Sequence, residues 1–105
     1  MDHLANMFQR QADLQDKLGV KFDQEYISTM TLAAIDELME ALRETPWKPW
    51  KKKQKLNVDE FKEELIDVWH FLINLSIASG MDSYEVVARF TLKNNINKKR
   101  KDEGY

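Results

Sequence analysis

Two pairs of carboxylates stand inside apolar stretches of this chain. Glu37 and Glu40 lie in the segment AAIDELMEAL, and Glu64 and Asp67 lie in EELIDVWHFL. A spacing of three residues places both acids of a pair on one face of a helix. Burying unpaired charge is costly, so four carboxylates that meet inside a protein need a cation between them. The two pairs therefore predict a divalent metal site.

The available ligand types narrow the choice of metal. The chain has no cysteine, which excludes disulfides and thiolate metal sites. Carboxylate oxygens favour Mg²⁺, with Mn²⁺ as the alternative, and Mg²⁺ held in this way completes its shell with water and substrate phosphates. The alternative interpretation is that both pairs are ordinary exposed acids at the edges of amphipathic helices. The two interpretations make different predictions, because only a metal site requires the pairs to meet.

The elements that must position these acids are expected to be helices. Only three glycines and two prolines occur, and alanine, leucine, glutamate and lysine dominate long stretches, which is typical of an all-α domain. The expected helices span residues 2–18, 28–44, 58–79 and 83–99, in one domain of residues 1–105. The buried stripe of the second helix should comprise Met30, Ala33, Ala34, Leu38, Ala41 and Leu42. If the second and third helices pack antiparallel, the four carboxylates meet at one level of the core.

Two basic stretches accompany the acidic ones. The connection between the second and third expected helices contains PWKPWKKKQK, and loops of this length and composition are often functional. Near the end of the chain, Lys93, Asn97 and Arg100 share one helix face and could grip a phosphate chain. The alternative for them is a solvated helix end whose cations favour the helix dipole. The formal net charge of −2 gives no general footprint for nucleic acid, so these clusters predict a small anionic ligand.

No stretch predicts a leader peptide or a membrane span. The start, MDHLANMFQRQ, lacks the basic and apolar regions of a signal peptide. The longest apolar run, residues 65–78, is interrupted by Asp67, His70 and Asn74. We expect a soluble, cytoplasmic protein without membrane partners. The first helix is less apolar than the two acidic helices, which predicts that a second copy covers part of the bundle as a homodimer.

The acidic motifs resemble the metal site of the all-α nucleoside triphosphate pyrophosphatases, the superfamily of the MazG-like enzymes and the dimeric dUTPases. AAIDELMEALRETPWKPWK and EELIDVWHFLINLSIASGMD resemble the core of the dimeric dUTPases, and the stretch from Lys93 to Gly104-Tyr105 resembles the closing motif of that family. The likeness runs from about Phe8 to the end of the chain. It implies a four-helix core completed by homodimerisation, and hydrolysis of dUTP to dUMP and pyrophosphate by attack of water on the α-phosphate.

The resemblance also implies roles for individual residues. The metal would be held by all four acids, and Glu37 or Glu40 would orient or deprotonate the water. The implied phosphate-binding residues are Lys93, Asn97 and Arg100, and the implied base-binding residues are Gln11, Trp47, Trp50 and Phe71. His70 is expected to have a structural or supporting role.

One position departs from the pattern of that family. An asparagine is expected one turn after Gln11, but Leu14 stands there and Gln15 follows. Because loss of one hydrogen bond to a base can change selectivity strongly, a dCTP pyrophosphatase or a broad-range MazG-like pyrophosphatase stays open beside dUTP. A non-catalytic nucleotide-binding helical bundle that retains the acids without turnover is the alternative from another functional class.

Overall fold

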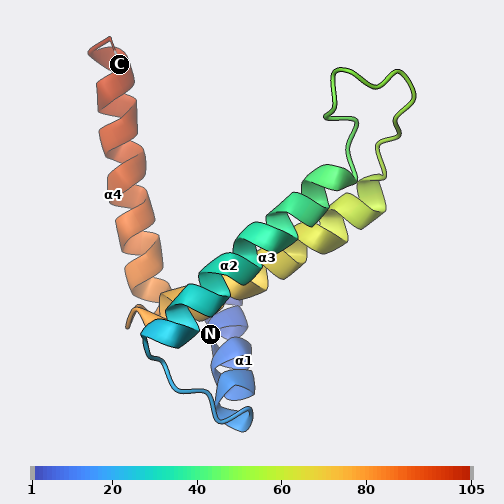
Figure 1. Cartoon of the computed structure of the whole chain (residues 1–105). Coiled ribbons are helices and arrows are strands. Elements are labelled where there is room, and N and C mark those ends of the chain that lie inside the picture. Colours follow the sequence, from blue (N-terminus) through green and yellow to red (C-terminus); the bar gives the residue numbers. More distant parts are fainter. Residues whose placement is uncertain (1, 105) are drawn as a thin grey trace.

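The computed structural model describes residues 2–104 and contains four helices and no strand among them. The helices are α1 (His3–Lys17), α2 (Gln24–Arg43), α3 (Val58–Ala78) and α4 (Ser83–Asp102) (Figure 1). The expectation of an all-α fold is confirmed. None of these four helices is both long enough and apolar enough to cross a membrane.

Each helix begins after an acidic or amide side chain that caps it. In every case the side chain accepts a hydrogen bond from the backbone N–H three residues later, and the four capping residues are Asp2, Asp23, Asn57 and Asp82. The expected start of the second helix at residue 28 was wrong. The carboxylate of Asp23 accepts from the backbone N–H of Tyr26 at 2.9 Å, so residues 24–27 already belong to α2.

The helices α2 and α3 form an antiparallel hairpin that makes the largest contact of the molecule. Ala34 and Ala41 are buried on α2, and these small side chains let the two backbones approach closely. On α3 they are matched by the buried residue Val68. Leu38 was expected in the same buried stripe, but its side chain is 52% exposed. The face of α2 that packs on α3 runs through the two alanines toward Glu37, and Leu38 points beside it.

The first helix packs across α3 at the end of the hairpin opposite the loop between α2 and α3. Phe8 and Ile73 supply buried apolar contacts there. Two polar residues of α1, Gln11 and Gln15, are also buried. This contact therefore buries polar groups, and each of them needs a hydrogen-bond partner.

The last helix leaves the other three. Its main contact is with α1, and most of its side chains are exposed, including Tyr84, Val87 and Phe90. Figure 1 shows α4 projecting away from the α2–α3 hairpin. A core made of four helices was expected, whereas three helices pack together within one chain. The second half of α4 is largely polar and basic, so it lacks a continuous apolar stripe that could bury it against its own chain.

Candidate metal centre and adjoining cavity

The hairpin brings the two acidic pairs together. Carboxylate oxygens of Glu37, Glu64 and Asp67 all lie within 4.8 Å of one another, and so do those of Asp36, Glu37 and Glu40. Glu37 belongs to both groups, so the acids of the two helices form one continuous cluster. Of its five members, Asp36 was not identified from the sequence, because it lies outside the three-residue spacing of the pair. Their role as metal ligands stays a prediction.

The electrostatics of the cluster show crowding of negative charge. A hydrogen bond with Glu37, followed by desolvation and the influence of Glu40, raises the pKa of Glu64 to about 7. The same hydrogen bond lowers the pKa of Glu37, but desolvation and the charges of Glu40 and Asp67 together outweigh it, so the pKa of Glu37 is raised. Without a cation, the cluster therefore tends to retain a proton.

A buried oxygen of Glu37 tests whether the cluster suits a cation. Oε2 of Glu37 is buried and has no hydrogen-bond partner among residues 2–104. A buried acceptor without a donor is costly, and an acceptor on a carboxylate more so. Several carboxylate oxygens facing one another suit a hard divalent cation. The residues present thus fit Mg²⁺ or Mn²⁺.

A cavity of about 370 Å³ adjoins the acid cluster between α1, α2 and α3. Asp67 belongs to both, since it is a member of the cluster and lines the cavity. Gln11 and Phe71, which the sequence predicts as base-binding residues, line this cavity together. Leu14, at the position where an asparagine was expected, also lines it.

Three amide side chains line this cavity together with Asp67 and His70. Nε2 of Gln11 donates to Oδ1 of Asn74 at 2.8 Å, and the hydroxyl of Tyr26 donates to Oε1 of Gln15 at 2.9 Å. Both Gln15 and Asn74 line the cavity, and neither of them was predicted from the sequence as a site residue. A signal for Asn74 existed, because it lies seven residues after Asp67 and hence on the same face of α3.

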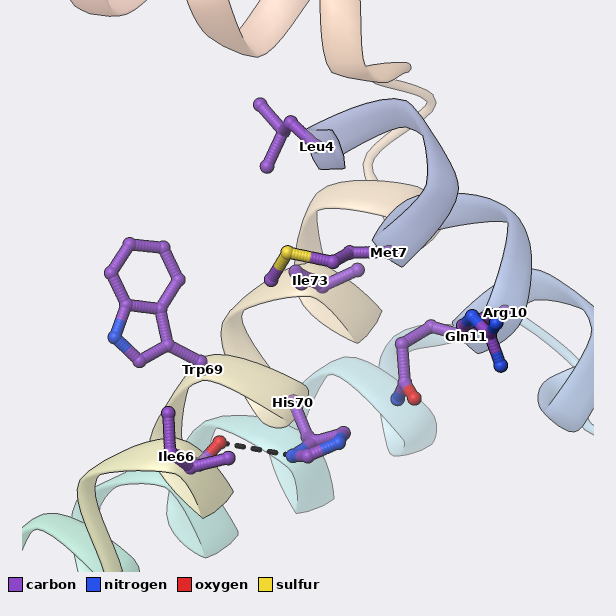
Figure 2. Close-up of a pocket in the computed structure, with 8 residues that line it drawn as sticks. All are labelled: Leu4, Met7, Arg10, Gln11, Ile66, Trp69, His70 and Ile73. Carbon is purple, nitrogen blue, oxygen red and sulfur yellow. Dashed lines mark hydrogen bonds between the residues drawn. The ribbon is translucent and has the colours of Figure 1, made fainter. Parts of the chain in front are cut away.

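The ring of His70 is fixed on its own helix. A carbonyl oxygen can only accept, so Nδ1 of His70 carries the proton and donates to the backbone oxygen of Ile66 at 2.9 Å (Figure 2). This contact orients the ring, and the structural or supporting role of His70 stays a prediction.

The loop between α2 and α3 is organised by its own side chains. The rings of Trp47 and Trp50 meet edge to face with their centroids 5.7 Å apart, and Nζ of Lys48 lies 5.9 Å from the Trp47 ring. The side chain of Gln54 bonds to backbone atoms of Lys48 and Lys51. Neither tryptophan lines the cavity beside Asp67, so within one chain the structure does not bring them to Gln11.

The predicted phosphate-binding residues are also remote from the acid cluster of their own chain. Lys93, Asn97 and Arg100 are exposed on α4, and this helix projects away from the hairpin that carries the acids (Figure 1). Within one chain the acids therefore lie beside the amide-lined cavity. The three predicted phosphate-binding residues of α4, called the phosphate clamp below, lie apart from both.

A second cleft, about 380 Å³ in volume, lies between α1 and α3 and is mainly apolar. Figure 2 shows Leu4 and Met7 from α1 and Ile66, Trp69 and Ile73 from α3 around it. Met7, Ile66 and Trp69 are 40%, 52% and 48% exposed. These large apolar side chains stay in contact with water in a single copy.

Three curated proteins are similar to this chain. A dCTP pyrophosphatase of Enterobacteria phage T4 is 32% identical over 88 residues, which cover 70% of this chain and 52% of that protein. A dCTP pyrophosphatase of Enterobacteria phage LZ5 is 42% identical over 71 residues, covering 56% of this chain and 41% of that protein. A DNA replication protein of phage T4 is 30% identical over 77 residues, covering 60% and 20%. The chain thus spans about half the length of the first two.

No solved structure matches the chain significantly. A family model described as dUTPase matches residues 3–85, which include α1, α2, α3 and both acidic pairs. The matched region therefore contains the whole acid cluster and every residue that lines the adjoining cavity. The chain belongs to this dUTPase family, among the all-α nucleoside triphosphate pyrophosphatases.

Proposed function

We propose that this protein is a metal-dependent pyrophosphatase of pyrimidine deoxynucleoside triphosphates, with dCTP as the first candidate substrate. The observation that best supports this proposal is that Asp67 belongs both to the acid cluster and to the lining of the amide-lined cavity. A nucleotide whose base occupies the cavity would hold its phosphates beside the acids. The names of two relatives support dCTP, and so does Leu14, which cannot make the hydrogen bond expected of a uracil-reading asparagine. The family match supports dUTP as the second candidate.

In this proposal the acid cluster holds Mg²⁺, or Mn²⁺, through Glu37, Glu40, Glu64 and Asp67. When bound, such an ion spreads the negative charge that develops on the phosphoryl oxygens and lowers the pKa of water.

The chain's own residues then handle the proton and the base. A carboxylate of α2, from Glu37 or Glu40, takes the proton of the water whose oxygen attacks the α-phosphorus. The bond between the α-phosphorus and the bridging oxygen breaks, so pyrophosphate and the nucleoside monophosphate leave. Gln11 and Phe71 hold the base at a fixed distance from the acids, and this positioning lowers the entropic part of the barrier.

A second copy of the chain completes the site in this proposal. Lys93, Asn97 and Arg100 of α4 would grip the phosphates bound at the acid cluster of the partner, and the loop with Trp47 would close over the partner's cavity or its own. The support is that α4 projects away from its own cluster and that the cleft between α1 and α3 leaves large apolar side chains exposed. Assembly would bury these surfaces, as homodimers commonly do.

The test is pyrophosphate release from a panel of deoxynucleoside triphosphates in the presence of Mg²⁺, with a chelator in the control. We expect dCTP and dUTP to be hydrolysed faster than dTTP, dATP and dGTP, and no release with the chelator. Absence of hydrolysis of every nucleotide, in Mg²⁺ and in Mn²⁺, would falsify the proposed activity. Fast hydrolysis of purine nucleotides would instead exclude the assignment of the amide-lined cavity to a pyrimidine.

A further inference from the structure

We infer that Met30 and Asn74 act as positioning residues that fix the orientation of the Gln11 amide, and thereby decide which of the two pyrimidines, cytosine or uracil, the cavity accepts. This inference rests on the proposed function, because it concerns the base of the same substrate. It goes beyond it by assigning selectivity to two residues that need not touch the reacting atoms.

The first step concerns the orientation of Asn74. Its Nδ2 lies 3.8 Å from the sulfur of Met30, which is within the range of a weak hydrogen bond to sulfur. A thioether sulfur carries no hydrogen and can only accept. The opposite orientation of the amide would place Oδ1 of Asn74 against the sulfur, with two acceptors facing each other. Met30 therefore holds the NH₂ group of Asn74 on its own side.

In the second step, the orientation of Asn74 determines that of Gln11. With Nδ2 turned to Met30, Asn74 presents Oδ1 to α1, and Gln11 donates to it through Nε2 at 2.8 Å. Gln11 is 8% exposed and Asn74 is 5% exposed, so water can hardly replace either partner. A flipped Gln11 would oppose two acceptor oxygens in a buried place, which is costly. The carbonyl Oε1 of Gln11 is therefore the group left for a ligand.

The third step concerns what a carbonyl at this place can recognise. Cytosine and uracil have nearly the same shape, and they differ in the order of donor and acceptor along one edge. The exocyclic group of cytosine donates and its N3 accepts, whereas in uracil the exocyclic oxygen accepts and N3 donates. A fixed acceptor on the wall can pair with the donor at only one of these two places in a given pose. A Gln11 amide that could flip would pair with both bases.

The neighbouring amide shows why the sulfur matters. Gln15 accepts from the hydroxyl of Tyr26 at 2.9 Å. A hydroxyl rotates and can donate or accept, so Tyr26 does not fix the orientation of Gln15 as Met30 fixes that of Asn74. Selectivity between the two pyrimidines is therefore carried by the chain Met30, Asn74 and Gln11.

The experiment replaces Met30 by leucine, which keeps the volume of the side chain and removes the acceptor. Met39→Leu, on the same helix and 41% exposed, is the matched control. The measured quantity is the ratio of kcat/KM for the preferred pyrimidine nucleotide to that for the other one. We expect this ratio to fall by about five- to tenfold in Met30→Leu, mainly through KM, and to stay at the wild-type value in Met39→Leu. Asn74→Leu, which breaks the same chain at its next member, should lower the ratio in the same direction.

Binding of dCMP and dUMP without metal provides a readout that does not need turnover. Calorimetry should show a preference for one monophosphate in the wild type and a smaller preference in Met30→Leu and Asn74→Leu. An unchanged ratio in both folded variants would overturn the inference while leaving the proposed activity intact. If no nucleotide is hydrolysed, the proposed activity fails, and the binding preference still decides the inference: equal binding of both monophosphates by the wild type would overturn it.

Discussion

Glu37 and Glu64 face each other across the hairpin, and a proton on Glu64 relieves the repulsion between the two carboxylates. The pKa of Glu64 is raised to about 7 because its protonated carboxyl donates a hydrogen bond to Glu37, because it is desolvated and because Glu40 is near. A divalent cation and this proton compete for the same oxygens. Protonation of Glu64 should therefore control both the stability of the metal-free protein and its affinity for metal.

The first prediction concerns the stability of the metal-free protein between pH 4.5 and about 7. In this range the folded chain holds a proton on Glu64 that the unfolded chain has lost, since the ordinary pKa of this group is 4.5 and its raised value is about 7. The free energy of unfolding should then decrease as the pH rises through this window. Added Mg²⁺ should oppose the decrease, because it favours the deprotonated acid. Thermal unfolding at several pH values, with and without Mg²⁺, measures both effects.

Glu64→Gln provides the control for this dependence. The variant cannot ionise at this position, so its metal-free stability should vary less with pH than that of the wild type. An identical slope in the variant would show that Glu64 does not hold the proton.

The second prediction concerns Glu40. Glu40→Gln removes a charge that raises the pKa of both Glu37 and Glu64, so the metal-free fold should be as stable as the wild type or more stable. Turnover should fall by about 100-fold or more, because a proposed ligand and base is lost. Glu63→Gln, an exposed acid beside Glu64, should keep nearly full activity. Pyrophosphate release and thermal unfolding measure the two effects, and normal activity of Glu40→Gln would remove Glu40 from the site.

At the scale of residues, the features that could be predicted from the sequence are those that depend on the spacing of side chains along a helix. Two carboxylates three residues apart must share a helix face, so the meeting of Glu37, Glu64 and Asp67 could be predicted once the helices were assumed to be antiparallel. Spacing also places Asn74 on the helix face of Asp67, but it does not reveal what Asn74 does there. A single amide in an apolar run looks like an interruption, and its meaning depends on which residues of α1 and α2 lie opposite.

At the scale of the elements, the hairpin and its loop set the geometry of the acids. The loop returns the chain from α2 to α3, and the backbone N–H of Asn57 donates to the carbonyl oxygen of Glu44 at 2.9 Å, which ties the two ends of the loop together. Within the loop, Gln54 accepts from the backbone N–H of Lys48 and donates to the carbonyl oxygens of Lys48 and Lys51. One side chain thus holds the basic stretch in shape.

The third prediction follows from these contacts of Gln54. Gln54→Ala removes all three hydrogen bonds, so the loop should open more often. A loss of about 1 to 1.5 kcal/mol in local stability corresponds to roughly five- to tenfold faster cleavage at its lysines. Limited trypsin digestion followed by mass spectrometry measures the rate after Lys51, Lys52, Lys53 and Lys55. Gln9→Ala, which removes an exposed contact with Asp13 on α1, is the control, and equal rates in the two variants would contradict the role of Gln54.

Capping residues and apolar periodicity predicted the existence of all four helices, and the start of α3 at Val58 was correct. The start of α2 was missed because Asp23 was interpreted as part of a link and not as the residue that caps the helix. The direction of α4 could not be predicted either. Apolar periodicity indicates that a helix has an apolar side. It does not indicate whether an element of the same chain or of another chain covers that side.

At the scale of the whole molecule, the chain is too extended for its length. Its radius of gyration is 17.1 Å, whereas a compact domain of about 100 residues has a radius of gyration of about 13 Å. Large apolar side chains are exposed both in the cleft, as with Trp69, and on α4, as with Phe90. These features support the proposed homodimer.

The fourth prediction tests whether two copies share their sites. Glu40→Gln and Lys93→Ala should each be inactive alone, because one lacks a proposed ligand and the other lacks the phosphate clamp. If the clamp serves the partner's acid cluster, mixed dimers contain one intact site, and a refolded equimolar mixture should recover about a quarter of wild-type activity. Pyrophosphate release from the mixture measures the recovery.

Light scattering after size-exclusion chromatography supplies the control for assembly. Wild type and both variants should elute as dimers at micromolar concentration. A monomeric wild type that hydrolyses nucleotides would contradict the shared site, and so would a mixture no more active than its components.

The small hydrophobic core of the chain has a consequence for its stability in a cell. Among residues 2–104 no large side chain is fully buried, and the buried apolar residues are few and mostly small: Phe8, Ala34, Ala41, Val68 and Ile73. If a second copy supplies the remaining stability, as proposed above, folding is a bimolecular equilibrium governed by mass action. The amount synthesised would then set the folded fraction. Dilution alone would return the protein to its unfolded, protease-sensitive form.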